Sequence, residues 1–326
     1  MSLPPLVCPA CRGPLVHDER YRCAPCGRDY PVVAGVIDFR LQPDPYIGLD
    51  DDRAKARRLA DAAHGKTFEQ LVRYYYSITP DDPPDLADVW TAHHLVEVEI
   101  GRRLLEASGS AQGRGRLLDL GCSTGGLVIA ATHGGWQAVG VDVALRWLIV
   151  GAHRMREAGL APTLVCANAE HLPFEDGAFD AVTGNDLLEH TAGLAPVLRE
   201  ARRVTSTSAI CVFTANNRFA PLPEPQVRLW GVTQLPRRVQ GAYVRWRRGD
   251  LHPYRLIVPS ARELGRALRT AGFSGARVDP APLFAPHWPQ GLGTRVLDAY
   301  NRVRRWPLVR QVCLAIGPRL LGSNRP

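Results

Sequence analysis

The chain carries, at its centre, the sequence Leu117-Leu-Asp-Leu-Gly-Cys-Ser-Thr-Gly-Gly126. An apolar run that ends in a glycine-rich turn directly before a helical stretch is typical of the first strand, turn and helix of a nucleotide-binding α/β fold. Glycines let the backbone approach a ligand closely, and the first turn of the helix offers unpaired N–H groups. We therefore expect this turn to bind a cofactor.

A second stretch indicates what kind of ligand binds there. Ala138-Val-Gly-Val-Asp142 predicts a buried strand that ends in a carboxylate, 23 residues after Asp119. In this position of the fold, a carboxylate can hydrogen-bond both hydroxyls of a ribose. The two stretches together predict a ligand that contains a nucleoside.

The glycine-rich turn argues against a dinucleotide. The pattern G-x-G-x-x-G has its second glycine where a pyrophosphate passes, and here that position is Ser123. Asp119, two residues before Gly121, would repel a phosphate, whereas a ligand with an ammonium and a sulfonium tolerates its charge. These residues favour S-adenosylmethionine, and a nicotinamide-dependent oxidoreductase remains the alternative.

Strands and helices alternate from residue 116 onward. The predicted strands cover 116–122, 138–142, 163–168, 179–185, 209–215, 275–279 and a last one near 313–321, and the predicted helices cover 126–133, 145–158, 193–204 and 260–271. This alternation predicts an α/β fold with a doubly wound, mostly parallel, seven-stranded Rossmann-like sheet, whose ligand crevice lies at the carboxyl ends of the strands.

Residues 117–216 resemble the class I S-adenosylmethionine-dependent methyltransferases, especially the ubiquinone/menaquinone type. Beside the two stretches above, the resemblance rests on Cys166-Ala-Asn-Ala-Glu-His-Leu-Pro-Phe174, on Phe179-Asp-Ala-Val182 with the Asn185, Asp186 and His190 that follow, and on Ala209-Ile-Cys-Val-Phe-Thr-Ala-Asn216. Two residues depart from the family pattern: Ser123 replaces a usual Gly, and Asn168 replaces a common Asp.

The resemblance implies roles for individual residues. The expected cofactor-binding residues are Asp119 near the ammonium, Gly121, Cys122, Ser123 and Gly125 along the methionine part, Asp142 with Val143 at the ribose, Asn168 with Ala169 at the adenine edge, and Asn185 after the fourth strand. A general base is needed only if the acceptor loses a proton. The candidate catalytic residues are Asp186 and His190. The alternative role of Asp186 is to bind the amino end of the cofactor, and the alternative role of His190 is structural packing.

Four cysteines predict a zinc site near the N-terminus. Cys8, Cys11, Cys23 and Cys26 have the spacing C-x2-C-x11-C-x2-C, which brings four thiolates to one tetrahedral ion. Four such ligands leave no open position, so the zinc should be structural. Two disulfides are the alternative, which the lack of an export signal disfavours. With the alternating stretch 29–39, these cysteines predict a ribbon that resembles the zinc heads of some bacterial methyltransferases, including ribosomal-RNA guanine methyltransferases.

The prolines at 43 and 45 and the acidic run 50–52 indicate where the ribbon ends. We expect a zinc ribbon over residues 1–42, a linker and helical lead-in over 43–110 with helices at 52–77 and 86–107, and a methyltransferase domain over 111–326.

The net charge of +8 is concentrated in two regions. Residues 217–258 hold eight arginines against two acidic residues, and residues 291–326 hold seven against one. We expect insertions at 217–258 and 281–312, which follow the carboxyl ends of strands and so should cover the acceptor pocket. Arginine mixed with aromatic and apolar residues suits a phosphate-bearing small molecule, a single-stranded RNA or an anionic membrane surface.

The sequence as a whole predicts S-adenosylmethionine-dependent methyl transfer to a bulky small molecule or lipid-linked metabolite, natural-product or quinone-like in kind. A ribosomal- or transfer-RNA base methyltransferase is the first alternative, and a zinc- and nucleoside-binding scaffold without activity is another. A composition of 45% hydrophobic and 22% charged residues excludes extensive disorder. The chain has neither an apolar run of ~18 residues nor a signal-peptide pattern, so we expect a cytoplasmic protein, with peripheral contact at the inner membrane surface as a further option.

Overall fold

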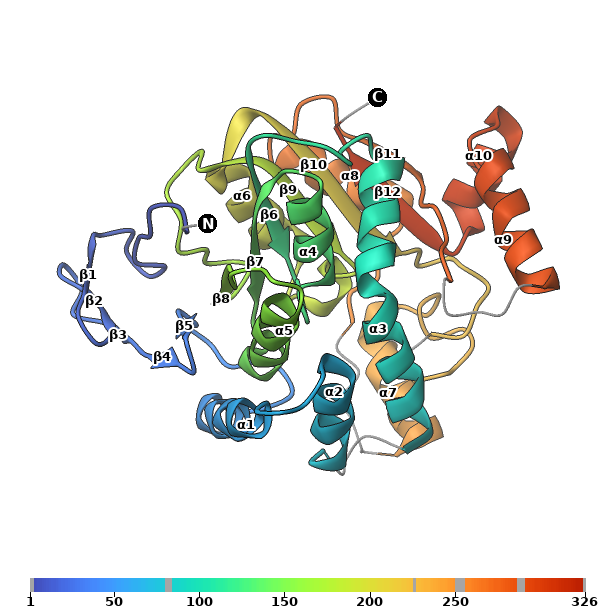
Figure 1. The fold of residues 1–326 in the computed structure, drawn as a ribbon. Helices are drawn as coiled ribbons and strands as arrows, with labels where there is room; N and C mark the ends of the chain where they lie inside the picture. The colour runs from blue at the N-terminus through green and yellow to red at the C-terminus, as the bar shows by residue number, and fades with distance from the viewer. Residues whose placement is uncertain (1–2, 80–83, 225–226, 250–255, 286–290, 325–326) are drawn as a thin grey trace. The chain divides into compact units, whose positions relative to one another are not determined.

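The computed structural model describes residues 3–79, 84–224, 227–249, 256–285 and 291–324 (Figure 1). They form two compact units. The first comprises residues 1–183, 203–209 and 285–287, and the second comprises 184–202, 210–284 and 288–326. Each unit is described by itself.

The sheet of the first unit has the strand order β9-β6-β7-β8-β5-β4. Its strands are β4 (Val32–Val33), β5 (Val36–Asp38), β6 (Arg116–Leu120), β7 (Gln137–Asp142), β8 (Leu164–Cys166) and β9 (Phe179–Asn185), the last of which ends in the second unit. β6 pairs with β7 and β7 with β8, both in parallel, so that Asp119 lies opposite Gly140 and Asp142 opposite Cys166. The predicted α/β fold is confirmed, and the carboxyl ends of β6 and β7 meet at one edge.

Two strands of this sheet come from the segment that we expected to complete the ribbon. The head itself is a three-stranded antiparallel sheet of β1 (Leu15–His17), β2 (Tyr21–Cys23) and β3 (Asp29–Tyr30). β5 instead pairs in parallel with β8, and β4 forms a hairpin with β5. The stretch 29–39 therefore divides between the head and the main sheet. The seven strands expected from the sequence correspond to β6–β12, and β4 and β5 are two additional strands.

The helices of the first unit pack on the sheet and on one another. They are α1 (Leu49–Ala62), α2 (Phe68–Ser77), α3 (Pro84–Ala107), α4 (Gly126–His133) and α5 (Leu145–Glu157). α4 contacts β6 and β7, and α5 contacts β5 and β8 (Figure 1). The stretch 52–77, predicted to be helical, is divided between α1 and α2, because Gly65 adopts φ +71° and Thr67 starts α2 with a capping box. α3 packs closely on α4 at Gly101, where a Cβ would lie 2.8 Å from the Cα of Leu127.

The second unit contains a smaller antiparallel arrangement of strands in the order β10-β12-β11. Its elements are η1 (Leu188–His190), α6 (Leu194–Val204), β10 (Thr205–Asn216), α7 (Arg237–Arg248), α8 (Ala261–Thr270), β11 (Arg277–Pro280), α9 (Leu292–Val303), α10 (Pro307–Ile316) and β12 (Arg319–Ser323), with the end of α6 and the start of β10 belonging to the first unit. α8 begins at Ser260, whose side chain forms a capping box with Glu263.

One predicted element of the second unit is wrong. The apolar run near 313–321 was expected to be the last strand, but residues 307–316 form α10 and the strand covers 319–323. Pro307 at the first position of the helix and Gly317 after its end are the signals that separate the two. Among the described residues, no helix is long and apolar enough to cross a membrane.

Candidate active site

The glycine-rich turn after β6 adopts a backbone conformation that explains its sequence. Gly121 and Gly125 have φ +71° and +74°, which glycine tolerates and other residues rarely adopt. Ser123 also has a positive φ, of 48°. The N–H groups of Gly121 and Cys122 both donate to the carbonyl of Val141, at 2.8 and 3.1 Å. The turn is thereby held against the end of β7.

Asp142 lies where the sequence predicts it, at the end of β7 beside this turn. Its two carboxylate oxygens accept hydrogen bonds from the N–H of Ser123 at 2.9 Å and from the N–H of Ala144 at 2.8 Å. Burial raises the pKa of Asp142, and these two hydrogen bonds oppose that rise. Because Ser123 contributes its backbone N–H, its side chain can replace the usual glycine without loss of this contact.

Asp119 is buried at the end of β6 and accepts a hydrogen bond from the Thr183 hydroxyl at 2.7 Å. Burial raises the pKa of Asp119 to about 7, while the Thr183 hydrogen bond opposes the rise. The charges of Asp142 and Glu97 raise this pKa further. A cation placed beside Asp119 would favour its ionised form.

Glu97 is a residue of this site that sequence reasoning missed. It projects from α3 and accepts hydrogen bonds from the Thr124 hydroxyl, from Arg154 at 3.0 Å and from His94 at 2.8 Å. Burial favours the neutral carboxyl, but the charges of His94 and Arg154 outweigh it and hold the pKa of Glu97 at about 2. No motif marks this glutamate, because it is the packing of α3 on α4 that brings it to the turn.

Asn168 has partners that were not expected. Its amide oxygen accepts from the N–H groups of Leu41 and Gln42 at 2.9 and 3.1 Å, and its amide nitrogen donates to the carbonyl of Gln42 at 3.2 Å. An aspartate could not donate to that carbonyl. The linker after β5 thus explains why an amide stands where the family commonly has a carboxylate. The expected contact of Asn168 and Ala169 with adenine stays a prediction.

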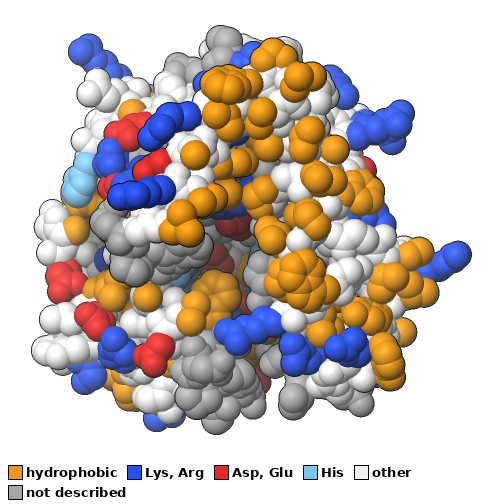
Figure 2. Space-filling model, turned by 90° about the vertical axis from the view of Figure 1, so that its right-hand side faces the viewer, with side chains coloured by type: hydrophobic (Ala, Val, Ile, Leu, Met, Phe, Trp, Pro, Cys, Tyr) orange, Lys and Arg blue, Asp and Glu red, His pale blue; other side chains and the backbone are white. Residues whose placement is uncertain are grey.

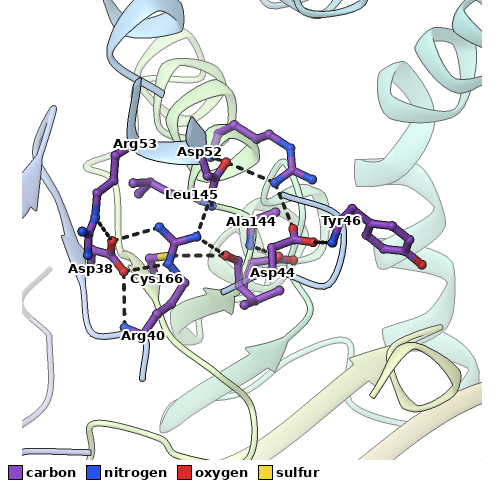
Figure 3. A network of polar contacts seen from close by, with 12 residues as sticks. Asp38, Arg40, Asp44, Tyr46, Asp52, Arg53, Ala144, Leu145 and Cys166 are labelled. Carbon is purple, nitrogen blue, oxygen red and sulfur yellow. Dashed lines mark hydrogen bonds and ion pairs between the residues drawn. The ribbon is translucent and has the colours of Figure 1, made fainter. Parts of the chain in front are cut away.

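A buried network of charges joins the same linker to the start of α5 (Figure 3). Asp52 of α1 accepts from the N–H of Leu145 at 3.0 Å and from the side chains of Arg40 and Arg146 at 2.6 and 3.1 Å. Arg40 also donates to the carbonyl of Val143 at 3.0 Å. Val143 and Leu145, which follow Asp142 closely, are therefore held by a segment about a hundred residues away. Asp52 also caps α5, a helix whose own N-cap residue makes no side-chain cap.

Further arginine and aspartate contacts complete the network. Asp38 accepts from Arg40 and Arg53, both at 2.8 Å, and Asp44 accepts from Arg146 at 2.9 Å. Three carboxylates thus face three guanidinium groups, so the buried charges balance.

The candidate catalytic residues belong to the second unit. Arg319 of β12 donates to the carboxylate of Asp186, with Nε and Oδ1 3.0 Å apart, and also to the side chains of Asn185 and Thr214 at 2.9 and 3.0 Å. A substrate proton would have to compete with this guanidinium for the Asp186 carboxylate. Asp186 itself has φ 53°. His190 has an exposed side chain at the end of η1.

Glu189, which precedes the candidate catalytic residue His190, has a fully buried carboxyl group. One of its oxygens accepts from the N–H of Asn216 at 3.2 Å, and the other has no hydrogen-bond partner in the described part of the chain. Burial raises the pKa of Glu189 to about 8, and the nearby charge of Asp186 contributes to the rise. Glu189 is therefore mostly protonated at neutral pH.

Arg319 also lines a pocket in the second unit. The other walls come from Asn217 after β10, from Thr233 and Val258 of the predicted insertion 217–258, and from Pro318. Sequence reasoning missed Arg319, because nothing distinguishes it from the other arginines of the C-terminal region. The pocket places insertion residues beside the group that holds Asp186.

The four cysteines of the head lie together as predicted. Their sulfur atoms are all within 4.8 Å of one another, with Cys8 and Cys26 at 3.7 Å and Cys11 and Cys23 at 3.4 Å. These separations suit four thiolates around one tetrahedral ion. Gly13 permits the arrangement, because a Cβ there would lie 2.6 Å from the ring of Pro25.

Comparison with known proteins identifies similar sequences. The family model described as "Methyltransferase domain" matches residues 118–213. The chain is 30% identical over 172 residues to the demethylmenaquinone methyltransferase of Roseiflexus castenholzii, covering 49% of this chain and 68% of the relative. It is 31% identical to the ubiquinone/menaquinone biosynthesis C-methyltransferase UbiE of Bartonella tribocorum, covering 49% of this chain and 64% of that protein.

A third relative is aligned over a longer part of the chain. It is the mitochondrial 2-methoxy-6-polyprenyl-1,4-benzoquinol methylase of Leishmania donovani, 27% identical over 237 residues, which are 68% of this chain and 80% of the relative.

Proposed function

Because the chain belongs to the class I S-adenosylmethionine-dependent methyltransferases, we propose that it transfers a methyl group from S-adenosylmethionine to a bulky, quinone-like or lipid-linked acceptor. The observation that carries the proposal is the Asp142 carboxylate, held by the N–H groups of Ser123 and Ala144 beside the glycine-rich turn. The acceptor class is supported by the names of two relatives, a C-methyltransferase of ubiquinone/menaquinone biosynthesis and a polyprenyl-benzoquinol methylase.

The residues around the turn suit S-adenosylmethionine. Asp119 and Asp142 are carboxyls whose ionisation burial opposes, so a ligand with positive charge would favour their ionised forms. In the proposed complex, Asp142 binds the ribose hydroxyls and Asp119 faces the ammonium. Bound S-adenosylmethionine supplies a methyl group activated by its sulfonium, so the chain's main tasks are to position the acceptor and to exclude water.

The second unit is proposed to receive the acceptor. The pocket beside Arg319 and the insertion 217–258 offers both apolar walls and a guanidinium. We propose that Arg319 positions Asp186, and that Asp186 or His190 accepts a proton if the acceptor must lose one. Arg319 also donates a hydrogen bond to Asn185, so one guanidinium contacts both a predicted cofactor-binding residue, Asn185, and a predicted base, Asp186.

We further propose that Cys8, Cys11, Cys23 and Cys26 hold a structural zinc ion. Their four sulfur atoms lie close enough to share one ion, and four thiolates fill the tetrahedral coordination of zinc. The ion would stabilise the head and would take no part in methyl transfer.

The proposal is tested with isotopically labelled S-adenosylmethionine. The purified chain is incubated with host lysate, and label is counted separately in RNA, lipid and small-molecule fractions. We expect label in the lipid or small-molecule fraction, and none with Asp142→Ala, which should weaken S-adenosylmethionine binding about 100-fold in calorimetry. Label in RNA alone would instead favour an RNA base methyltransferase. Unchanged affinity of Asp142→Ala would contradict the cofactor assignment.

A further inference from the structure

Helices α9 and α10 carry large apolar side chains on their outer faces. No described residue of α9 is buried. Leu292 and Val296 follow one another at i, i+4 spacing on α9, and Leu308, Val312 and Ile316 do so on α10, with exposed fractions between 49% and 84%. Figure 2 looks onto the side of the molecule where α9 and α10 lie and shows hydrophobic side chains gathered there, with Lys and Arg side chains around them. Surfaces of this kind mark interaction sites more often than isolated exposed residues do.

Both helices are anchored within the second unit, α9 at its C-terminal end and α10 on the face opposite its apolar side chains. Tyr300 donates from its hydroxyl to the carbonyl of Ala281 at 2.9 Å, and Arg304 donates to the carbonyl of Pro280. On α10, Arg310 forms an ion pair with Asp279 at 2.6 Å. The Arg310 contact fixes which side of α10 faces outward, and the contacts of Tyr300 and Arg304 hold the end of α9 in place.

The charges beside the apolar residues are mainly positive. Arg295, Arg302 and Arg305 of this segment are exposed, against the exposed acidic residue Asp298. Trp306, between the two helices, is 62% exposed. Apolar side chains flanked by arginine, with tryptophan at the boundary, are typical of helices that lie in the interface of an anionic membrane.

We propose that α9 and α10 together bind the surface of an anionic lipid membrane. The apolar side chains enter the region between head groups and acyl chains, and the arginines contact lipid phosphates. The other occupants fit less well. A second copy would bring arginines of like charge opposite each other. RNA bases could stack on Trp306, but the other apolar side chains of the surface are aliphatic and offer no ring for stacking. The inference does not depend on the identity of the methyl acceptor.

The test measures binding to vesicles without any methyl transfer. The full chain is sedimented with vesicles of 30% phosphatidylglycerol in phosphatidylcholine and with vesicles of phosphatidylcholine alone. We expect binding to the anionic vesicles that weakens with salt, and about fivefold weaker binding for Arg302→Gln. Leu308→Glu should lower the binding at least tenfold, because it removes an apolar side chain and adds a negative charge.

Gln311→Glu is the matched control, because it adds the same charge to an exposed position of α10 while every apolar side chain stays. It should retain clearly more binding than Leu308→Glu. Circular dichroism checks that both variants are folded. The proposal is overturned if the wild type does not bind anionic vesicles, or if Leu308→Glu and Gln311→Glu lose binding equally. It is also overturned if the wild type is a dimer that Leu308→Glu dissociates, since the face would then be an interface between copies.

Discussion

Replacement of Asp52 tests the network that joins α1 to the start of α5. The side chain is fully buried and accepts from one backbone N–H at 3.0 Å and from two arginines, Arg40 and Arg146, at 2.6 and 3.1 Å. Removing one partner of a buried ion pair costs about 3–5 kcal/mol, because the other charge is left buried without compensation. Arg40 keeps Asp38 and Arg146 keeps Asp44, so we expect the lower end of that range.

We therefore expect Asp52→Asn to lower the free energy of unfolding by about 3 kcal/mol. Asp52→Ala should cost about 1 kcal/mol more, since asparagine can still cap the N-terminus of α5 and alanine cannot. Both variants should also weaken S-adenosylmethionine binding, because Arg40 and Asp52 hold the backbone at Val143 and Leu145, next to Asp142. Urea unfolding gives the stabilities, and calorimetry gives the affinities.

Asp51→Asn is the control, because it removes the same charge from an exposed neighbour on the same helix and should change stability by less than about 0.5 kcal/mol. Equal stabilities of Asp52→Asn and Asp51→Asn would show that the buried network contributes nothing to the stability of the fold.

Three further predictions concern the other charged groups. The affinity for S-adenosylmethionine should fall about tenfold from pH 8 to pH 6, because Asp119, with a pKa of about 7, becomes protonated. Calorimetry at both pH values measures this change, and Asp119→Asn should show no such fall. Protonated Glu189 contributes stability that is complete below its unfolded pKa of 4.5 and is lost as pH rises through about 8. Glu189→Gln, which stays neutral, should therefore lose less stability than the wild type between about pH 5 and pH 9 in urea unfolding, and parallel pH profiles would contradict this. Replacement of both Cys8 and Cys23 by serine should release zinc and unfold the head. Elemental analysis measures the zinc, and Cys313→Ser, the control, should leave it in place. Full metal retention in the double variant would contradict the zinc site.

The features that local sequence predicted are those with short-range causes. Gly121 and Gly125 are required by the backbone of a single turn, and the apolar run 179–185 forms β9 with the predicted bounds. Asp142 meets the turn because parallel strands end at one edge of the sheet, which follows once the alternation of strands and helices is recognised. The cysteine spacing likewise predicted the sulfur cluster.

Local sequence failed where two structures fit the same residues. The apolar run after residue 311 suits a strand or a buried helix equally, and α10 forms there because Pro307 and the packing of its inner face favour a helix. Likewise, the alternating stretch 29–39 is compatible with either sheet, and only the pairing of β5 with β8 assigns its end to the main one.

The class of fold, the glycine-rich turn and the cysteine cluster could be predicted from local patterns, because each depends on neighbouring residues or on the order of strands and helices. The contacts of Leu41 and Gln42 with Asn168, of Asp52 with the start of α5, and of Arg319 with Asp186 are visible only in the folded chain. These contacts join residues about a hundred positions apart. Buried charges and amides must find partners wherever the fold brings them, and a linear pattern does not record which partners those are.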